Sequence, residues 1–354
     1  MLPRERIVRE ILDHGGWISF ARYMELALHA RGGYYASGAG EPGAAGDFVT
    51  APELGRLFGR TLARQLAPLV AQGPGLPILE LGAGSGALAE TLLGELDVDY
   101  WILETSAALR SRQEARLGKK VKHLDRLPER WRGIVLANEV ADAMPVHLVA
   151  WRADGVKERG VAFQNQEFHW QERPATGGLQ EEASKIRVPP PYESEIGLAA
   201  RAWMRALCEH LEHGLILVID YGFPRGEYYH PQRAAGTLMC HHRHTAHADP
   251  FARPGDEDIT AHVDFSALAA AARAAGAEVL CFATQAQFLV NCGITEVLGQ
   301  ANVENALVYA PIAAQAQKLL SPAEMGELFK VLAVGKGIAT PLLGFSRGDR
   351  RHAL

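Results

Sequence analysis

Residues 78–89 read Ile-Leu-Glu-Leu-Gly-Ala-Gly-Ser-Gly-Ala-Leu-Ala, and this stretch decides the fold of a chain of 354 residues. An apolar strand ends in three alternating glycines, Gly82, Gly84 and Gly86, and a helix begins directly after them. Glycine permits positive φ angles and the close approach of a ligand, while the start of a helix offers unpaired N–H groups. The stretch therefore predicts a strand, a turn and a helix that together bind a nucleotide-like ligand.

The identity of that ligand is left open by the glycine spacing, because Gly82, Gly84 and Ala87 also fit the dinucleotide fingerprint of NAD and FAD proteins. Glu80, two residues before the first glycine, can bind an ammonium group but would repel a pyrophosphate. Glu104 ends the next apolar segment, about twenty residues further on, where a carboxylate accepts hydrogen bonds from ribose hydroxyls. S-adenosylmethionine carries an ammonium group and no phosphate, so these residues favour it over a dinucleotide.

The composition is that of an ordinary globular protein, with 48% hydrophobic and 22% charged residues. A formal net charge of −5 gives no reason to expect a nucleic-acid partner. The four cysteines are widely spaced without a C-x-x-C pair, which favours reduced thiols in a cytoplasmic protein. No apolar stretch is long enough to span a bilayer, and residues at the amino terminus do not resemble a secretion signal, so we expect a cytoplasmic protein.

Strands and helices alternate regularly after residue 76, a pattern that predicts an α/β fold with a parallel sheet covered by helices on both faces. We divide the chain into a helical segment at 1–76, a cofactor-binding core at 77–145 and 190–340, and an inserted antiparallel sheet at 146–189. The stretch from 221 to 261 is expected to be irregular. The expected core strands are 77–81, 99–104, 121–124, 133–137, 215–220, 278–283 and 329–336, and the expected helices are 87–95, 106–117, 194–210 and 264–275.

Two shorter segments each allow two interpretations, one structural and one functional. Thr50 and Glu53 form a capping-box pattern with Pro52 in the first helical turn, yet Asp47 before them is unexplained by a cap. The segment is therefore either a helix start or a loop of the cofactor site, with Asp47 and Thr50 as candidate cofactor contacts. Residues 258–264 are either the cap of the following helix, through Thr260 or Asp264, or part of an acceptor cleft.

Polar side chains follow the later strands, and ligands of open α/β sheets bind at these carboxyl ends. Asn138, Glu139 and Asp142 follow the strand at 133–137, and Asp220 ends the strand at 215–220. Helix capping or turn formation would account for Asn138 and Asp142 without any function. We take Glu139, Asp142 and Asp220 as candidate catalytic residues, and Asn138 as a candidate cofactor contact.

The chain resembles the class I methyltransferase-like family that includes the mitochondrial complex I assembly factor known as the MidA homologue. The resemblance runs through most of the sequence and rests on the blocks 32–35, 46–53, 82–86, 138–145, 220–222, 236–237, 258–264, 287–289 and 293–294. It implies a Rossmann-like, seven-stranded methyltransferase fold with S-adenosylmethionine as cofactor. It also implies a protein partner, since the mitochondrial member dimethylates an arginine of a complex I subunit symmetrically. Ala286 stands where we expect this family to prefer glycine.

For such a reaction, carboxylates that hold the guanidinium bidentately are the chemistry required. Two other functions stay open: a non-catalytic assembly factor that binds the cofactor, and a nicotinamide-dependent oxidoreductase. The latter is disfavoured because Glu80 faces the phosphate position and no hydride-transfer constellation is evident.

The run from Cys240 to His247 is rich in histidine, which raises the hypothesis of a metal site. Its spacing fits no familiar zinc pattern, so we expect no metal site there.

Overall fold

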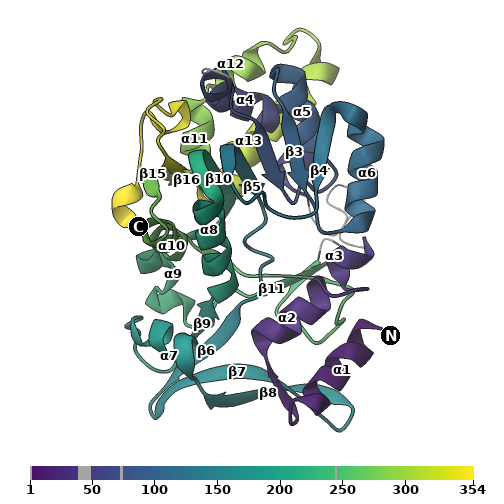
Figure 1. The fold of residues 1–354 in the computed structure, drawn as a ribbon, viewed down its shortest axis with the longest axis vertical. Coiled ribbons are helices and arrows are strands. Elements are labelled where there is room, and N and C mark those ends of the chain that lie inside the picture. The colour runs from purple at the N-terminus through teal and green to yellow at the C-terminus, as the bar shows by residue number, and fades with distance from the viewer. Residues whose placement is uncertain (1, 39–48, 72–74, 244) are drawn as a thin grey trace.

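The structure of the chain, a computed structural model, describes residues 2–38, 49–71, 75–243 and 245–354 (Figure 1). Within these residues the strands form one large mixed sheet, one five-stranded antiparallel sheet and one three-stranded antiparallel sheet. In Figure 1 the large sheet occupies the upper half and the five-stranded sheet the lower half, while β11 of the third sheet lies between them. The molecule thus has two layers of different architecture that meet at the carboxyl ends of the main strands.

The large sheet follows the strand order β15-β16-β10-β5-β2-β3-β4, with the short β14 paired to the end of β10. The strands β4, β3, β2, β5 and β10 run parallel, while β16 is antiparallel to both of its neighbours. The bounds are β2 Ile78–Leu81, β3 Tyr100–Leu103, β4 Val121–Leu124, β5 Trp131–Asn138, β10 Leu211–Phe223, β14 Val263–Asp264, β15 Glu278–Thr284 and β16 Phe329–Lys336. The predicted seven strands are confirmed, and the last one has the predicted bounds.

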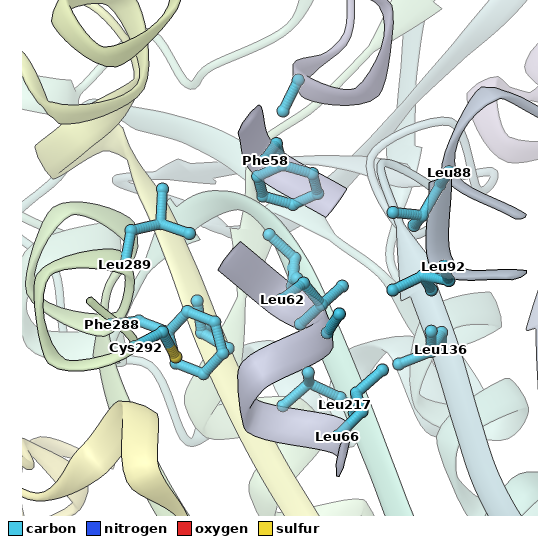
Figure 2. Close-up of a cluster of buried hydrophobic side chains, with 14 of the residues drawn as sticks. Phe58, Leu62, Leu66, Leu88, Leu92, Leu136, Leu217, Phe288, Leu289 and Cys292 are labelled. Carbon is cyan, nitrogen blue, oxygen red and sulfur yellow. The ribbon is translucent and has the colours of Figure 1, made fainter. Parts of the chain in front are cut away.

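Helices cover both faces of this sheet, as the alternating pattern predicted. One face carries α4 (Arg56–Val70), α5 (Ala87–Glu95) and α11 (Gln285–Asn291), whose apolar side chains pack against β5 and β10 (Figure 2). Figure 2 shows Leu62 and Leu66 of α4 beside Leu136 and Leu217 of the sheet. On the other face, α8 (Leu198–His210) and α10 (Phe265–Ala274) form a second apolar cluster with the sheet. Burial of these two clusters holds the strand ends in place.

The amino-terminal helices lie on a different sheet. α1 (Pro3–Asp13) and α2 (Phe20–Leu28) bury their apolar faces in a cluster with the five-stranded sheet. Their helical spacing was predicted, but the intervening β1 (Trp17–Ser19), which pairs with β7, was missed. The other strands of this sheet are β6 His147–Arg152, β7 Gly155–Gln164, β8 Glu167–Pro174 and β9 Tyr192–Ile196.

Two sequence expectations after residue 188 are wrong. The helix expected from Ser194 begins only at Leu198, because residues 192–196 pair with β6 as strand β9. The stretch expected to be irregular, 221–261, contains the three-stranded sheet of β11 Met239–His242, β12 Thr245–His247 and β13 Asp258–Thr260. Both errors have the same cause: these strands form by pairing with partners distant in the sequence, and local sequence patterns do not contain that information.

The remaining described helices are shorter or lie at the edges of these clusters. They are α3 Tyr34–Ser37, α6 Ala107–Leu117, α7 Gly177–Ser184, α9 Arg225–Tyr228, α12 Ile294–Gly299, α13 Ala306–Leu320, α14 Met325–Leu328, and the short 3₁₀ helices η1 Ala51–Leu54, η2 Gly118–Lys120, η3 Pro231–Arg233, η4 Leu343–Phe345 and η5 Arg351–Ala353. Ala286 lies inside α11, where a helical backbone needs no glycine. Among the described helices, none combines the length and the apolar character needed to cross a membrane.

Candidate functional site

The glycine turn has the backbone that its sequence predicted. Gly82, Gly84 and Gly86 have φ angles of 61°, 54° and 81°, a region that favours glycine. Gly86 is the N-cap of α5, and the first N–H groups of that helix follow the turn directly. All of these features lie at the carboxyl end of β2, and Gly82 and Gly84 line a cavity of about 640 Å³. The volume falls in the range of small-molecule sites.

Glu80 lies at the inner end of this cavity and is almost completely buried. Its Oε2 atom accepts a hydrogen bond of 2.7 Å from the hydroxyl of Tyr100 on the neighbouring strand. Burial raises the pKa of Glu80 to about 7, against the effect of the Tyr100 hydrogen bond. A bound cation would replace the lost solvation of this carboxylate, so the position suits the ammonium group for which we proposed it.

Glu104 follows β3 and lines the same cavity. One carboxylate oxygen accepts from the backbone N–H of Ser106 (2.9 Å), and the other accepts from the side-chain amide of Gln113 (3.1 Å). The same Gln113 amide donates to the carbonyl of Gly84. Gln113 therefore ties the acidic residue to the glycine turn, and the carboxylate is fixed in orientation with lone pairs left for a diol.

The segment at 49–54 forms part of the cavity wall. Thr50 lines the cavity and holds the N-cap position of η1, but its side chain makes no capping hydrogen bond, so the predicted capping box is wrong. Glu53 instead accepts a hydrogen bond from the hydroxyl of Ser85 in the glycine turn. Pro52 lies in the first turn as predicted. Asp47 lies outside the described residues.

Glu139 occupies a backbone conformation that side chains rarely adopt, with a φ of 54°. Such outliers occur mostly at functional sites, where the surrounding structure holds them. Its Oε1 atom accepts from the backbone N–H of Ala51 (3.2 Å) and from the amide of Asn138 (3.1 Å). Burial, and then the carboxylate of Asp142, raise the pKa of Glu139 to about 8. Asn138 does not cap a helix, and its Oδ1 atom is buried without a hydrogen-bond partner among the described residues.

Asp142 lies beside Glu139 in the wall of the cavity and is also buried. Its Oδ1 atom accepts from the N–H of Ala143 at 2.8 Å, and the hydroxyl of Tyr221 donates to its side chain. Burial raises the pKa of Asp142 to about 6. Two carboxyl groups of raised pKa thus share one wall with Asn138, which is an arrangement that favours a cationic ligand.

Asp220 has a different place from the one we expected. Its carboxylate is fully buried and does not belong to the cavity wall. The Oδ2 atom accepts backbone hydrogen bonds from Val140, Ala141 and Asp142 at 3.2, 2.9 and 3.3 Å, while Oδ1 accepts from Tyr221 at 2.9 Å. Burial, together with the nearby carboxylates, raises the pKa of Asp220. Asp220 therefore positions the segment that carries Asp142, and we no longer count it among the residues that touch a substrate.

The cavity lining also includes residues of the 258–264 segment and others to which the sequence assigned no role. The three-stranded sheet contributes Met239, His241, Asp258 and Thr260, and the hydroxyl of Tyr35 donates to Asp258 at 2.7 Å. Several of these positions lie in the blocks that carry the family resemblance, which was their only signal in the sequence. Both interpretations of 258–264 hold, for different residues. Asp264 caps α10 by accepting from the N–H of Ala267, whereas Asp258 and Thr260 line the cavity.

A cationic side chain, that of Arg233, also lines the cavity. Its guanidinium carbon lies 3.7 Å from the centre of the Phe223 ring, and the guanidinium also donates to the carbonyl of Glu227. The neighbouring His262 has a pKa lowered to about 4 by burial and by the charges of Arg233 and Lys330. The cavity lining therefore combines the guanidinium of Arg233 with several acidic side chains.

The comparisons with known proteins agree with this geometry. Residues 57–283 match the protein family described as "Putative S-adenosyl-L-methionine-dependent methyltransferase". A Burkholderia thailandensis protein, described as a "likely methyl transferase" and crystallised with S-adenosyl-homocysteine, superposes with a TM-score of 0.95 at 45% identity, covering 99% of this chain and 96% of its own. A second crystal structure of a protein from that organism superposes with a TM-score of 0.92 at 46% identity, over 99% of this chain and 96% of its own.

Curated relatives cover nearly the whole chain at lower identity. The protein arginine methyltransferase NDUFAF7 of Danio rerio is 29% identical in an alignment that covers 90% of this chain and 83% of its own length. The homologue of that enzyme in Drosophila melanogaster is 28% identical in an alignment that covers 94% of this chain and 86% of its own length.

Proposed function

Since this chain belongs to the family of S-adenosyl-L-methionine-dependent methyltransferases, we propose that it transfers the methyl group to an arginine guanidinium of a partner protein. S-adenosylmethionine is its methyl donor. We place the donor against the glycine turn, with Glu80 at the ammonium group, Glu104 at the ribose, and Asn138 and Thr50 as further contacts. The buried Oδ1 atom of Asn138 supports this placement, because a ligand would supply the donor it lacks.

One observation carries the choice of acceptor: Glu139 and Asp142 line the cavity that contains the glycine turn, and Glu139 is held there in a strained backbone conformation. Carboxylates pair with guanidinium groups in short, charge-assisted and often bidentate hydrogen bonds. The named activity of the curated relatives, protein arginine methylation, agrees with this chemistry.

The two carboxyl groups would act on charge and position. A guanidinium keeps its proton far above neutral pH, so its attacking nitrogen must lose a proton as the new bond forms. Bound S-adenosylmethionine supplies a methyl group on a sulfonium, whose sulfur takes the electron pair of the broken C–S bond. Glu139 takes the proton from the guanidinium nitrogen, and its raised pKa makes it a better base than an exposed glutamate. Asp142, fixed by Tyr221, orients the guanidinium.

We also propose a subunit of respiratory complex I as the first partner to test, and symmetric dimethylarginine as the product. Both rest on the resemblance to the complex I assembly factor family. The acidic lining of the cavity supports the guanidinium acceptor, and it does not bear on the partner protein or on the methylation state.

The test is transfer of labelled methyl groups from S-adenosylmethionine to a co-purified partner protein, with the modified residue and its methylation state read by mass spectrometry. Label on arginine in the wild type, and none with Glu139→Gln, would support the proposal. Methylation of lysine or of a carboxylate by the wild type would overturn the arginine acceptor. If the cofactor binds and no partner is methylated under any condition, the chain acts as a cofactor-binding assembly factor.

A further inference from the structure

Cys240, His247 and Glu257 come together on the face of the three-stranded sheet that is turned away from the cavity. In this sheet Cys240 pairs with His247 across β11 and β12, and with Ile259 across β11 and β13. Directly paired residues project from the same face of a sheet, and so does the residue two positions along the strand. Glu257 stands two positions before Ile259. One possible ligand atom from each of the three residues lies within 4.8 Å of the others.

The cluster contains a carboxylate that the protein leaves incompletely satisfied. Cys240 and Glu257 are both fully buried. The Oε2 atom of Glu257 lies 3.0 Å from Nε2 of His247, while Oε1 is buried without a hydrogen-bond partner among the described residues. Burial raises the pKa of Glu257, although the backbone and the charge of Arg253 also favour its ionised form. A buried carboxylate oxygen without a hydrogen-bond partner is costly, so Oε1 is available to a positively charged ligand.

We propose that Cys240, His247 and Glu257 bind one divalent transition-metal ion, with zinc as the metal that fits best. Thiolate sulfur, imidazole nitrogen and carboxylate oxygen are the three ligand types that zinc takes in proteins, whereas calcium and magnesium prefer oxygen alone. Zinc takes four ligands, and water supplies the fourth because the side chain of His247 is 28% exposed.

Binding requires two changes of protonation in this cluster. The thiol of Cys240 gives up its proton to solvent as the sulfur–zinc bond forms. The N–H of Asp249 donates to Nδ1 of His247 (3.3 Å), which assigns the ring proton to Nε2, facing Glu257. Coordination through Nε2 moves this proton to Nδ1, and the N–H of Asp249 turns away. One proton is released in total, so zinc affinity falls as the pH is lowered.

The location suggests what such an ion does. Met239, His241, Asp258 and Thr260 on the opposite face of the same sheet line the cavity. In Figure 1, β11 lies between the two larger sheets. A metal that links β11, β12 and the start of β13 stiffens the wall that faces the acceptor. Its ligands differ from the groups proposed to bind the cofactor and the guanidinium.

The sequence expectation of no metal site rested on spacing within 240–247. That run contains only two of the three ligands, and strand pairing brings them together. Glu257 lies well outside the run, so no familiar zinc spacing was visible.

The test uses the full chain, treated with a chelator, loaded with zinc and freed of excess metal by gel filtration. Mass spectrometry of the metal content should give one zinc per chain for the wild type and for Cys281→Ser, a matched thiol control on β15. The double variant Cys240→Ser with His247→Gln should retain less than a tenth of that zinc. Equal zinc in this double variant, or no zinc in the wild type, would overturn the proposal.

Loading the wild type with cobalt gives a readout that needs no variant. Thiolate coordination produces a sulfur-to-cobalt charge-transfer absorption, which we expect with a stoichiometry of one. Cobalt bound without that absorption would place the metal elsewhere and contradict the assignment, even if the double variant failed to fold.

Discussion

The carboxylate of Asp220, near the carboxyl end of β10, accepts a hydrogen bond of 2.9 Å from the backbone N–H of Ala141, in the segment after β5. The same oxygen also accepts from the two residues on either side of Ala141. A single buried carboxylate thus fixes the turn that presents Glu139 and Asp142 to the cavity. The two neighbouring parallel strands are thereby coupled at the point where the chemistry is proposed to occur.

Asp220→Asn should damage this turn without touching the cavity directly. An asparagine amide cannot accept at the nitrogen position, so at least one of the backbone N–H groups is left unsatisfied, at a cost of about 1–3 kcal/mol in the free energy of unfolding. We expect the kcat of methyl transfer to fall more than cofactor affinity. Thermal unfolding and calorimetry with S-adenosyl-homocysteine check both parts. Loss of cofactor binding with unchanged stability would contradict the positioning role.

Glu139→Gln should separate cofactor binding from transfer. Glutamine keeps an oxygen that accepts from Ala51 and Asn138, so the local structure is preserved. It cannot take a proton, and loss of a general base lowers kcat by about 100-fold or more. Calorimetry should show unchanged binding of S-adenosyl-homocysteine. If binding is lost together with transfer, Glu139 belongs to the cofactor site instead.

Glu139→Gln should also change how the free energy of unfolding depends on pH. The pKa of Glu139 is raised from 4.5 to about 8 in the folded protein, so the folded state holds this proton more tightly than the unfolded chain. The contribution of Glu139 to the free energy of unfolding is fully present below pH 4.5 and is lost as the pH rises to about 8. Glu139→Gln, which cannot ionise, should therefore be more stable than the wild type at pH 8.5, by on the order of 2 kcal/mol.

Denaturant unfolding at pH 5 and pH 8.5 measures this difference. Glu90→Gln is the control, because the side chain of Glu90 is 52% exposed and lies on the surface of α5. Equal pH dependence in the wild type and Glu139→Gln would show that the carboxyl group is solvated in the folded state.

Much of the fold could be read from local signals, and the errors share one cause. The glycine turn predicted α5 with its observed bounds, and the apolar run at 329–336 predicted β16. By contrast, Tyr192–Ile196 is a strand only because β6 lies beside it, and β1 exists only by pairing with β7. Short segments whose structure depends on distant partners carry little local information.

The residues of the candidate site were likewise predictable only in part. Strand ends identified Glu139 and Asp142, because parallel strands place their carboxyl ends on one edge. Arg233 and Met239, which also line the cavity, come from a stretch that has no strong periodicity. Asp220 was expected to be catalytic because it ends a strand, and only the hydrogen bonds to the 140–142 backbone reveal that its carboxylate is already used.

Glu80→Gln should weaken cofactor binding without a specific effect on transfer. The donor and its product S-adenosyl-homocysteine carry the same ammonium group, so affinity for both should fall roughly tenfold, which corresponds to about 1.4 kcal/mol. Because the pKa of Glu80 is about 7, the wild type should bind S-adenosyl-homocysteine more tightly at pH 8 than at pH 6, and Glu80→Gln should lose this dependence. Calorimetry at both pH values tests this, with Glu90→Gln as the control. An unchanged affinity would remove Glu80 from the cofactor site.

Arg233 should favour acceptor sequences with an acidic residue near the methylated arginine. Its guanidinium stacks on Phe223 and donates to a backbone carbonyl, and the described residues form no ion pair with it. Glu139 and Asp142, which line the same cavity as Arg233, are proposed to hold the acceptor guanidinium, so a carboxylate close to that arginine in the peptide would pair with Arg233. We expect Arg233→Gln to lower kcat/KM for an acid-flanked arginine peptide roughly tenfold, or about 1.4 kcal/mol, and to leave a neutral-flanked peptide nearly unchanged. Equal losses for both peptides would show that Arg233 supports the wall of the cavity and does not select the sequence around the arginine.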